Sequence, residues 1–141
     1  MMNEEIRSIM SNNPLTVGPD DTIQAVTDLM LRRRKQQLPV VENGVLVGLI
    51  TSYDLWRNLR ETSCVGEGTV RDVMTTDVVK LAPKDKIGTA AELFIDQRFK
   101  TLPVVNLRGE LKGVITAFDV IKYHFKKEYP DPILYREVLL D

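Results

Sequence analysis

The sequence predicts a mixed α/β or α+β fold made of two copies of one supersecondary unit. The run Leu-Pro-Val-Val at residues 38–41 returns unchanged at residues 102–105, 64 positions later. Short runs rich in valine and isoleucine alternate with stretches whose apolar residues recur at helical spacing. A unit that repeats at a fixed period cannot bury its apolar face alone, so we expect the two copies to pack on each other.

Each copy is expected to fold as a strand, a helix, a hairpin and a second helix. The first helix of the first copy is expected to begin at Asp21, a favourable N-cap with Gln24 at the third helical position. The basic run at residues 32–35 is expected to end it, because positive charge stabilises a helix C-terminus. The apolar stripes of the two first helices correspond. They are Ile23, Val26, Thr27, Met30 and Leu31 in one copy and Ile87, Ala90, Ala91, Phe94 and Ile95 in the other.

A β-hairpin is expected after each first helix. Asn43 and Gly44 separate its strands in the first copy, and Asn-Gly is the strongest short hairpin signal. The second copy has a longer turn through residues 107–109. Because residues 38–41 are continuously apolar, we expect this strand to be covered on both faces, as strands are when helices pack over a sheet, which indicates the mixed fold class.

A second helix is expected to begin after Asp54 in the first copy and after Asp119 in the second. In the C-terminal tail Pro130 and Pro132 exclude a helix, whereas residues 133–140 are long enough for a short one that packs on the body or on a partner. These features divide the chain into four parts: repeat 1 at 1–60, a linker at 61–68, repeat 2 at 69–125 and the tail at 126–141.

The composition is that of a globular protein, with 43% hydrophobic and 28% charged residues. The net charge of −1 gives no general attraction to nucleic acid, so a nucleic-acid partner is not expected. The longest apolar run, residues 45–50, is far shorter than the roughly 20 residues of a membrane-spanning helix. With so short an apolar run, we do not expect the chain to enter the membrane. The single cysteine, Cys64, cannot form an internal disulfide and fits a reducing compartment, so we expect a cytoplasmic protein.

The candidate site is a Gly-x-x-Thr-x-x-Asp segment that occurs in both copies, each time where a strand ends and a helix begins. A helix N-terminus suits a phosphate, because its first N–H groups are unpaired and its dipole is positive there. Thr51 and Thr116 add a hydroxyl, and the carboxylates of Asp54 and Asp119 can accept hydrogen bonds from both hydroxyls of a ribose. The same spacing is close to a capping box that only starts a helix. Two interpretations therefore remain open, a nucleotide site and a helix cap.

With these motifs in this order, the chain resembles a tandem pair of cystathionine-β-synthase (CBS) domains, called a Bateman module, over nearly all residues up to Phe125. The matching elements are Ile9-Met10 and Val73-Met74, the Pro-x-Asp runs from Pro19 and Pro83, both Leu-Pro-Val-Val runs and both Gly-x-x-Thr-x-x-Asp segments. The resemblance implies a β-α-β-β-α fold for each repeat and packing of the repeats sheet to sheet with pseudo-two-fold symmetry. It also implies two clefts between the repeats, which in this family often hold adenine nucleotides.

The resemblance assigns roles in nucleotide binding to residues of both repeats. These are Asp54 and Asp119 for the ribose, Thr51 and Thr116 for the phosphate, Thr16 and Lys80 in the first strands beside the adenine, and Gln37 and Thr101 along the pocket walls.

Basic residues near the ends of the first helices are the candidates for reaching a phosphate. Arg34, Arg98 or Lys100 is expected to do so, although positive charge there is also an ordinary complement to a helix dipole. Lys35 stands where the second repeat has Phe99, so we expect two unequal pockets, of which at most one binds tightly.

The sequence lacks the residue groups that common catalytic sites require. His124 is the only histidine, so one chain cannot assemble a metal cluster of histidines and cysteines, a Ser-His pair or a Cys-His pair. We expect His124 on a helix surface, and Tyr53 and Trp56 in the core or an interface. A Gly-x-x-x-x-Gly-Lys-Ser/Thr loop does not occur either. An enzyme, a catalytic cofactor and a bound metal are therefore not expected.

The sequence and the resemblance together indicate a regulatory module that binds an adenine nucleotide, AMP or ADP before ATP, and signals by conformational change. The resemblance also implies a flat homodimer that acts on a partner enzyme or transporter, whether the chain is free-standing or part of something longer. Two alternatives remain open. One is a nucleotide-independent dimerisation or interaction scaffold, and the other is a module for another adenosyl ligand such as S-adenosylmethionine.

Overall fold

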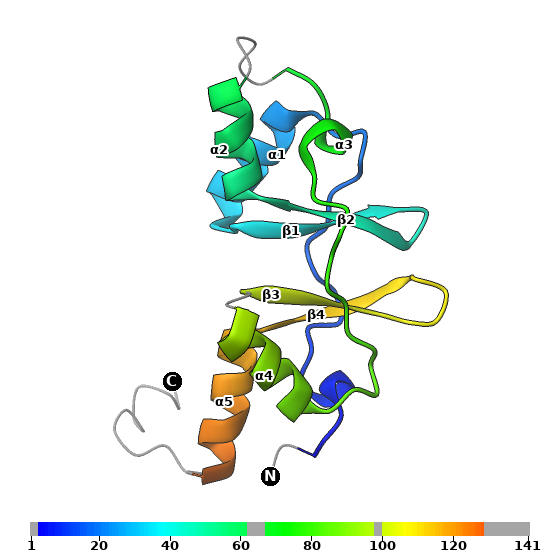
Figure 1. Ribbon diagram of the computed structural model, residues 1–141, viewed down its shortest axis with the longest axis vertical. Coiled ribbons are helices and arrows are strands. Elements are labelled where there is room, and N and C mark those ends of the chain that lie inside the picture. The colour runs from blue at the N-terminus through cyan, green and yellow to red at the C-terminus, as the bar shows by residue number, and fades with distance from the viewer. Residues whose placement is uncertain (1–2, 62–66, 98–99, 129–141) are drawn as a thin grey trace.

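The computed structural model describes residues 3–61, 67–97 and 100–128 of the 141-residue chain. Two small sheets face each other at the centre, and a pair of helices covers the outer side of each (Figure 1). The predictions for Cys64, Arg98, Phe99 and the tail from residue 129 lie outside the described residues. None of the helices in the described part has the length and apolar character that crossing a membrane requires.

The two halves repeat the same order of elements, which confirms the predicted mixed fold of two similar units (Figure 1). The first half has the short helix η1 (Ile6–Ser8), α1 (Ile23–Arg33), β1 (Gln37–Glu42), β2 (Val45–Thr51) and α2 (Ser52–Glu61). The second half has α3 (Val70–Val73), α4 (Ile87–Gln97), β3 (Thr101–Val105), β4 (Leu111–Thr116) and α5 (Ala117–Glu128). Each sheet is one antiparallel hairpin, β1–β2 or β3–β4.

The strand expected at the start of each repeat is shortened to one parallel bridge, between Val17 and Val40 and between Leu81 and Val104. Prolines explain this in the first half. The N–H of Val17 donates to the carbonyl of Pro39, and the N–H of Val41 donates to that of Val17. The next donors on either side would be Pro39 and Pro19, which have no N–H. The same arrangement occurs in the second half, with Pro103 and Pro83.

The predicted start of α1 is wrong by one residue, because Thr22 and not Asp21 is the N-cap. The Thr22 hydroxyl accepts a hydrogen bond from the Ala25 N–H at 3.1 Å. The carboxylate of Asp21 is used one turn earlier, where it accepts from the Gly18 N–H at 2.8 Å. The basic end of α1 is confirmed, and Arg34 is its C-cap in the left-handed region with φ of 53°.

The predicted hairpins are confirmed. Asn43 and Gly44 have φ of 53° and 82°, as a two-residue turn of type I′ requires. In the longer second turn, the Asn106 side chain accepts hydrogen bonds from the N–H groups of residues 108 and 110. Three consecutive residues of β1, at 38–40, are buried, so this strand is covered on both faces as expected.

The opening segment of each half packs on the other half. Ile6 is fully buried among apolar residues of the second half, including Ile87 and Ile115. Val70 is fully buried in the core of the first half. Pairs of backbone hydrogen bonds fix these crossings, between Ser11 and Val114 and between Leu49 and Thr75. The core of the first half is therefore completed by α3, and the core of the second half by η1.

The glycine of each Gly-x-x-Thr-x-x-Asp segment lies at a crossing. A Cβ atom on Gly48 would lie 2.8 Å from the Thr75 carbonyl oxygen, and one on Gly113 would lie 2.5 Å from that of Ser11. Real Cβ atoms do not approach backbone so closely. These glycines therefore allow the two halves to interlock, and the backbone geometry explains them without a ligand.

The Gly113→Ala variant is expected to lower the free energy of unfolding by about 1–3 kcal/mol, the usual cost of overpacking. The backbone of residue 11 must move to admit the methyl group, and this movement loosens the crossing. Urea unfolding of the purified chain measures the effect. Gly18→Ala is the control, because its Cβ would lie 3.7 Å from the nearest atom. Equal stability of the two variants would contradict the assignment.

Candidate functional site

Both Thr-x-x-Asp segments form complete capping boxes. The Asp54 N–H donates to the Thr51 hydroxyl at 3.1 Å, and the Thr51 N–H donates to Asp54 Oδ2 at 3.0 Å. At the start of α5 the corresponding distances between Asp119 and Thr116 are 3.1 and 2.8 Å. The helix-cap interpretation is therefore correct for both copies. It uses one carboxylate oxygen of each aspartate and leaves Oδ1 for another partner.

The two aspartates differ in what surrounds this second oxygen. Asp54 is buried, with 3% of its surface exposed, and its Oδ1 lies 3.6 Å from Nη2 of Arg57. Asp119 is partly exposed and makes no ion pair among the described residues. It lines a cavity of about 410 Å³ between the two halves of the molecule. Only the second copy of the motif thus turns a carboxylate toward this cavity.

The cavity collects residues from four separate segments of the chain. The opening segment contributes Ser11, Asn13, Pro14 and Leu15, and the first half adds Arg33, Lys35, Gln37, Leu38 and Pro39. The second half adds Thr101, Val114, Thr116 and Asp119. Four residues expected in nucleotide binding, Gln37, Thr101, Thr116 and Asp119, therefore lie around one space.

The positive charges of the cavity come from Arg33 and Lys35, and Arg34, one of the three cations expected to reach a phosphate, does not line it. Arg34 caps α1 in the left-handed conformation, and its side chain lines a groove on the helices with Trp56 and Leu59. The reversal of the backbone at the cap separates Arg34 from its two neighbours. A basic run at a helix end signals cations near the site, but only the cap conformation decides which of them face it.

Two other basic residues expected at the site, Lys100 and Lys80, do not line the cavity of Asp119. Lys100 donates a hydrogen bond of 2.6 Å to the side chain of Gln36, which is its counterpart in the first half. Lys80 lines a different cavity, beside Arg7 and Lys84.

Thr16 is exposed and does not line the cavity of Asp119, and its role beside an adenine stays a prediction. Residues 13–15, just before it, take that position instead. The expected first strand is reduced to a bridge at Val17, and no regular strand places Thr16 along the cleft.

Gln37 gives the cavity an unsatisfied polar atom. Its side-chain oxygen is buried and has no hydrogen-bond partner, although Gln37 lines the cavity. A buried acceptor without a partner costs free energy, and an N–H donor of a bound molecule would satisfy it.

The corresponding positions near Asp54 carry different charges. Asp77 replaces Asn13, and Gln97 replaces Arg33. Phe99, which replaces Lys35, lies outside the described residues. The surroundings of Asp54 therefore gain a carboxylate and lose a cation relative to the cavity of Asp119.

The outer helices expose an apolar face. Tyr53 and Trp56 are 60% and 53% exposed, so of the two expected positions, core or interface, the core is excluded and the interface stays a prediction. Leu55 takes the buried position on this helix. His124 is exposed on α5, as expected. Across both halves the exposed apolar residues of the helices are Leu31, Tyr53, Trp56, Leu59, Ile95, Phe118, Ile121 and Phe125.

The described residues contain no group of three or more histidine, cysteine, aspartate or glutamate side chains placed to hold a metal ion.

Comparison with known proteins identifies both repeats. The sequence model described as the CBS domain matches residues 6–58 and 70–126. Protein MJ1225 of Methanocaldococcus jannaschii is 33% identical over 86% of this chain and 47% of its own length. The CBS domain-containing protein YhcV of Bacillus subtilis is 30% identical over 82% of this chain and 81% of its own.

Solved structures agree with these matches. The structure of MJ1225 superposes with a TM-score of 0.79 at 28% identity, covering 87% of this chain and 48% of that one. CBSX2 in complex with AMP superposes with a TM-score of 0.78 at 25% identity, covering 89% and 98%. The chain spans about half the length of MJ1225 and about a quarter of the inosine-5′-monophosphate dehydrogenase of Thermoplasma acidophilum, a further relative.

Proposed function

The chain belongs to the CBS domain family, and on that premise we propose that it is a regulatory module that binds an adenine nucleotide in the cavity of Asp119. One observation carries the proposal. A carboxylate, a threonine hydroxyl and two cations, from Asp119, Thr116, Arg33 and Lys35, converge on one space between the repeats. The AMP complex of CBSX2, a neighbour at 25% identity, supports this class of ligand.

The chemistry of the cavity matches the parts of a nucleotide. Asp119 Oδ1 is not used by the capping box and can accept from ribose hydroxyls. The Thr116 hydroxyl accepts from the Asp119 N–H, so its own proton remains available to a phosphate oxygen. Arg33 and Lys35 make no ion pair among the described residues and match the charge of one or two phosphates. The unsatisfied oxygen of Gln37 can accept from an amino group such as that of adenine.

We assign one such site to each chain, and AMP or ADP in preference to ATP. Near Asp54, Arg57 already approaches the free carboxylate oxygen, and Asp77 adds negative charge where a phosphate would need the opposite. Two cations in the cavity of Asp119 balance a short phosphate chain better than the longer chain of ATP.

The ligand would act by fixing how the halves are arranged. It would contact Lys35 and Gln37 in one half, Asp119 in the other, and the opening segment at Asn13. A molecule that binds one arrangement more tightly shifts the population toward it by the difference in affinity. The output would pass to a partner enzyme or transporter in the cytoplasm, and we assign no catalytic step to the chain.

We further propose that two chains associate as a homodimer through the outer helices. The apolar residues exposed on α1 and α2 have equivalents on α4 and α5, so both halves present the same kind of face. Cavities of about 500 and 660 Å³ lie between these helices. Contiguous exposed apolar surface of this kind marks an interaction site, and a two-fold axis would bury both faces together.

An adenosyl ligand without phosphate, such as S-adenosylmethionine, is the second candidate. It would use Asp119 and Gln37 in the same way but would leave Arg33 and Lys35 unpaired. A scaffold without a ligand is the third, and the capping boxes favour it to the extent that they explain Thr116 and Asp119 structurally.

Asp119→Ala is expected to weaken AMP binding by about 10- to 100-fold, because hydrogen bonds to a charged group contribute roughly 1.5–3 kcal/mol. Isothermal titration with AMP, ADP, ATP, NAD and S-adenosylmethionine measures this. Asp54→Ala loses the equivalent cap and is the matched control, with AMP affinity unchanged. If none of these ligands binds the unmodified chain, the scaffold without a ligand is the remaining interpretation.

Lys35→Ala is expected to weaken AMP about tenfold and to leave adenosine unchanged, because the side chain would contact only the phosphate. The Kd values of both ligands, measured by titration calorimetry, check this. Arg34→Ala is the control, since Arg34 faces the helix groove and should alter neither affinity. Equal losses for AMP and adenosine would place the phosphate elsewhere.

Ile121→Asp is expected to convert the dimer to a monomer, because it places a charge in the apolar helix face where Ile121 is 63% exposed. Sedimentation velocity of the unmodified chain and the variant measures the mass. Val79→Asp changes an exposed apolar residue outside the helices and should leave the dimer intact. A monomeric unmodified chain would overturn the proposal.

A further inference from the structure

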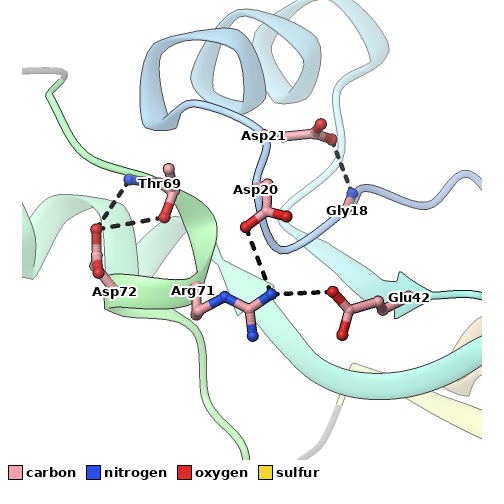
Figure 2. A network of polar contacts seen from close by, with 7 residues as sticks. All are labelled: Gly18, Asp20, Asp21, Glu42, Thr69, Arg71 and Asp72. Atoms are coloured by element: carbon pink, nitrogen blue, oxygen red, sulfur yellow. Dashed lines mark hydrogen bonds and ion pairs between the residues drawn. The ribbon is translucent and has the colours of Figure 1, made fainter.

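The two halves hold the same arginine in different electrostatic surroundings. Arg71 belongs to α3, which packs on the first half. Its Nη2 lies 3.0 Å from Glu42 and 3.4 Å from Asp20 (Figure 2). The hydrogen bond to Glu42, the largest cause, raises the pKa of Arg71 above its usual value. This arginine is therefore neutralised by two carboxylates from separate segments of its own chain.

The counterpart of Arg71 is Arg7, and the two carboxylates are missing around it. Lys84 stands in place of Asp20, and Asn106 stands in place of Glu42. The turn itself is the same in both halves. Asp21 accepts from the N–H of Gly18 at 2.8 Å (Figure 2), and Asp85 accepts from that of Ala82 at 2.8 Å. The backbone of the turn is thus preserved, while a lysine and a neutral amide replace the two carboxylates.

A cavity of about 580 Å³ lies where these carboxylates are missing. Arg7, Lys80 and Lys84 supply its positive charge, and Asp85 is the only acidic residue that lines it. Neither lysine makes an ion pair among the described residues. Arg7 contacts Glu5 at 2.7 Å, which leaves further guanidinium donors for a second acceptor. We call this space the basic groove.

Asn106 and five apolar residues form the rest of the basic groove. The apolar residues are Leu81, Ala82, Pro83, Val105 and Leu107. Leu107 is fully exposed at the tip of the second hairpin. The basic groove shares no lining residue with the cavity of Asp119, so the two sites can be occupied at the same time.

We propose that the basic groove docks an acidic segment of a partner protein, with carboxylates beside Arg7 and Lys84 and an apolar side chain against Leu107. The first half shows that carboxylates pair with an arginine at this position, because Asp20 and Glu42 contact Arg71 there. The apolar lining suits side chains of a peptide and offers nothing to a phosphate backbone. The net charge of −1 also disfavours nucleic acid.

Fluorescence anisotropy with a short labelled peptide of alternating glutamate and leucine tests the proposal. The decisive variant combines Lys84→Asp with Asn106→Glu, which gives Arg7 the carboxylates that Arg71 has. We expect it to lose at least about tenfold in peptide affinity, as for the loss of one charge-assisted hydrogen bond, and to keep its affinity for AMP. An unchanged urea-unfolding midpoint shows that the variant folds.

Three outcomes overturn the proposal. The first is that the peptide does not bind, or binds the double variant as well as the unmodified chain. The second is that a peptide with glutamine in place of glutamate binds equally, which would make the contact merely apolar. The third is that duplex DNA or inorganic phosphate binds with the same sensitivity to the variant while the peptide does not. The outcome is independent of whether AMP binds the cavity of Asp119.

Discussion

The crossing of each opening segment over the hairpin of the other half is the constraint on which the remaining structure depends. It buries Ile6 and Val70 in cores to which their own sequence repeats do not belong. It also requires glycine at residues 48 and 113, since any side chain there would meet backbone. The cavity of Asp119 exists because residues 11–15 cross beside β4, so the interlocking that completes the cores also forms the wall of the site.

Much of this fold could be predicted from local chemistry. The Asn43-Gly44 turn and the buried run at 38–41 follow from backbone preferences and apolar pattern that act over a few residues. The loss of the first strands was also visible in principle, because Pro19 and Pro39 lack the donors that a parallel ladder needs. The exchange of opening segments could not be predicted, because a repeat pattern indicates that two units pack together but not which segment packs on which unit.

The candidate site was predicted in kind and only partly in detail. Thr116 and Asp119 lie where the motif places them, because their capping box fixes them to the first turn of α5. Which cations reach a phosphate stays a prediction, but the left-handed cap at Arg34 turns its side chain to the helices and leaves Arg33 and Lys35 at the cavity. A sequence pattern identifies a helix end, whereas the direction of each side chain there depends on a single φ angle.

The repeat also separates residues that fold the chain from residues free to do something else. The prolines, the crossing glycines and the capping pairs occur in both halves, because both halves need the same bends and helix starts. Charges that no fold element requires differ between the halves. Arg33 corresponds to Gln97 in the repeat, and Asp20 corresponds to Lys84. The arginine position is one such case, because Arg71 pairs with Asp20 and Glu42, whereas Arg7 pairs with Glu5 and has Lys84 and Asn106 at the positions of those two carboxylates. The physical case for function is therefore strongest where two copies of one backbone carry unlike charges.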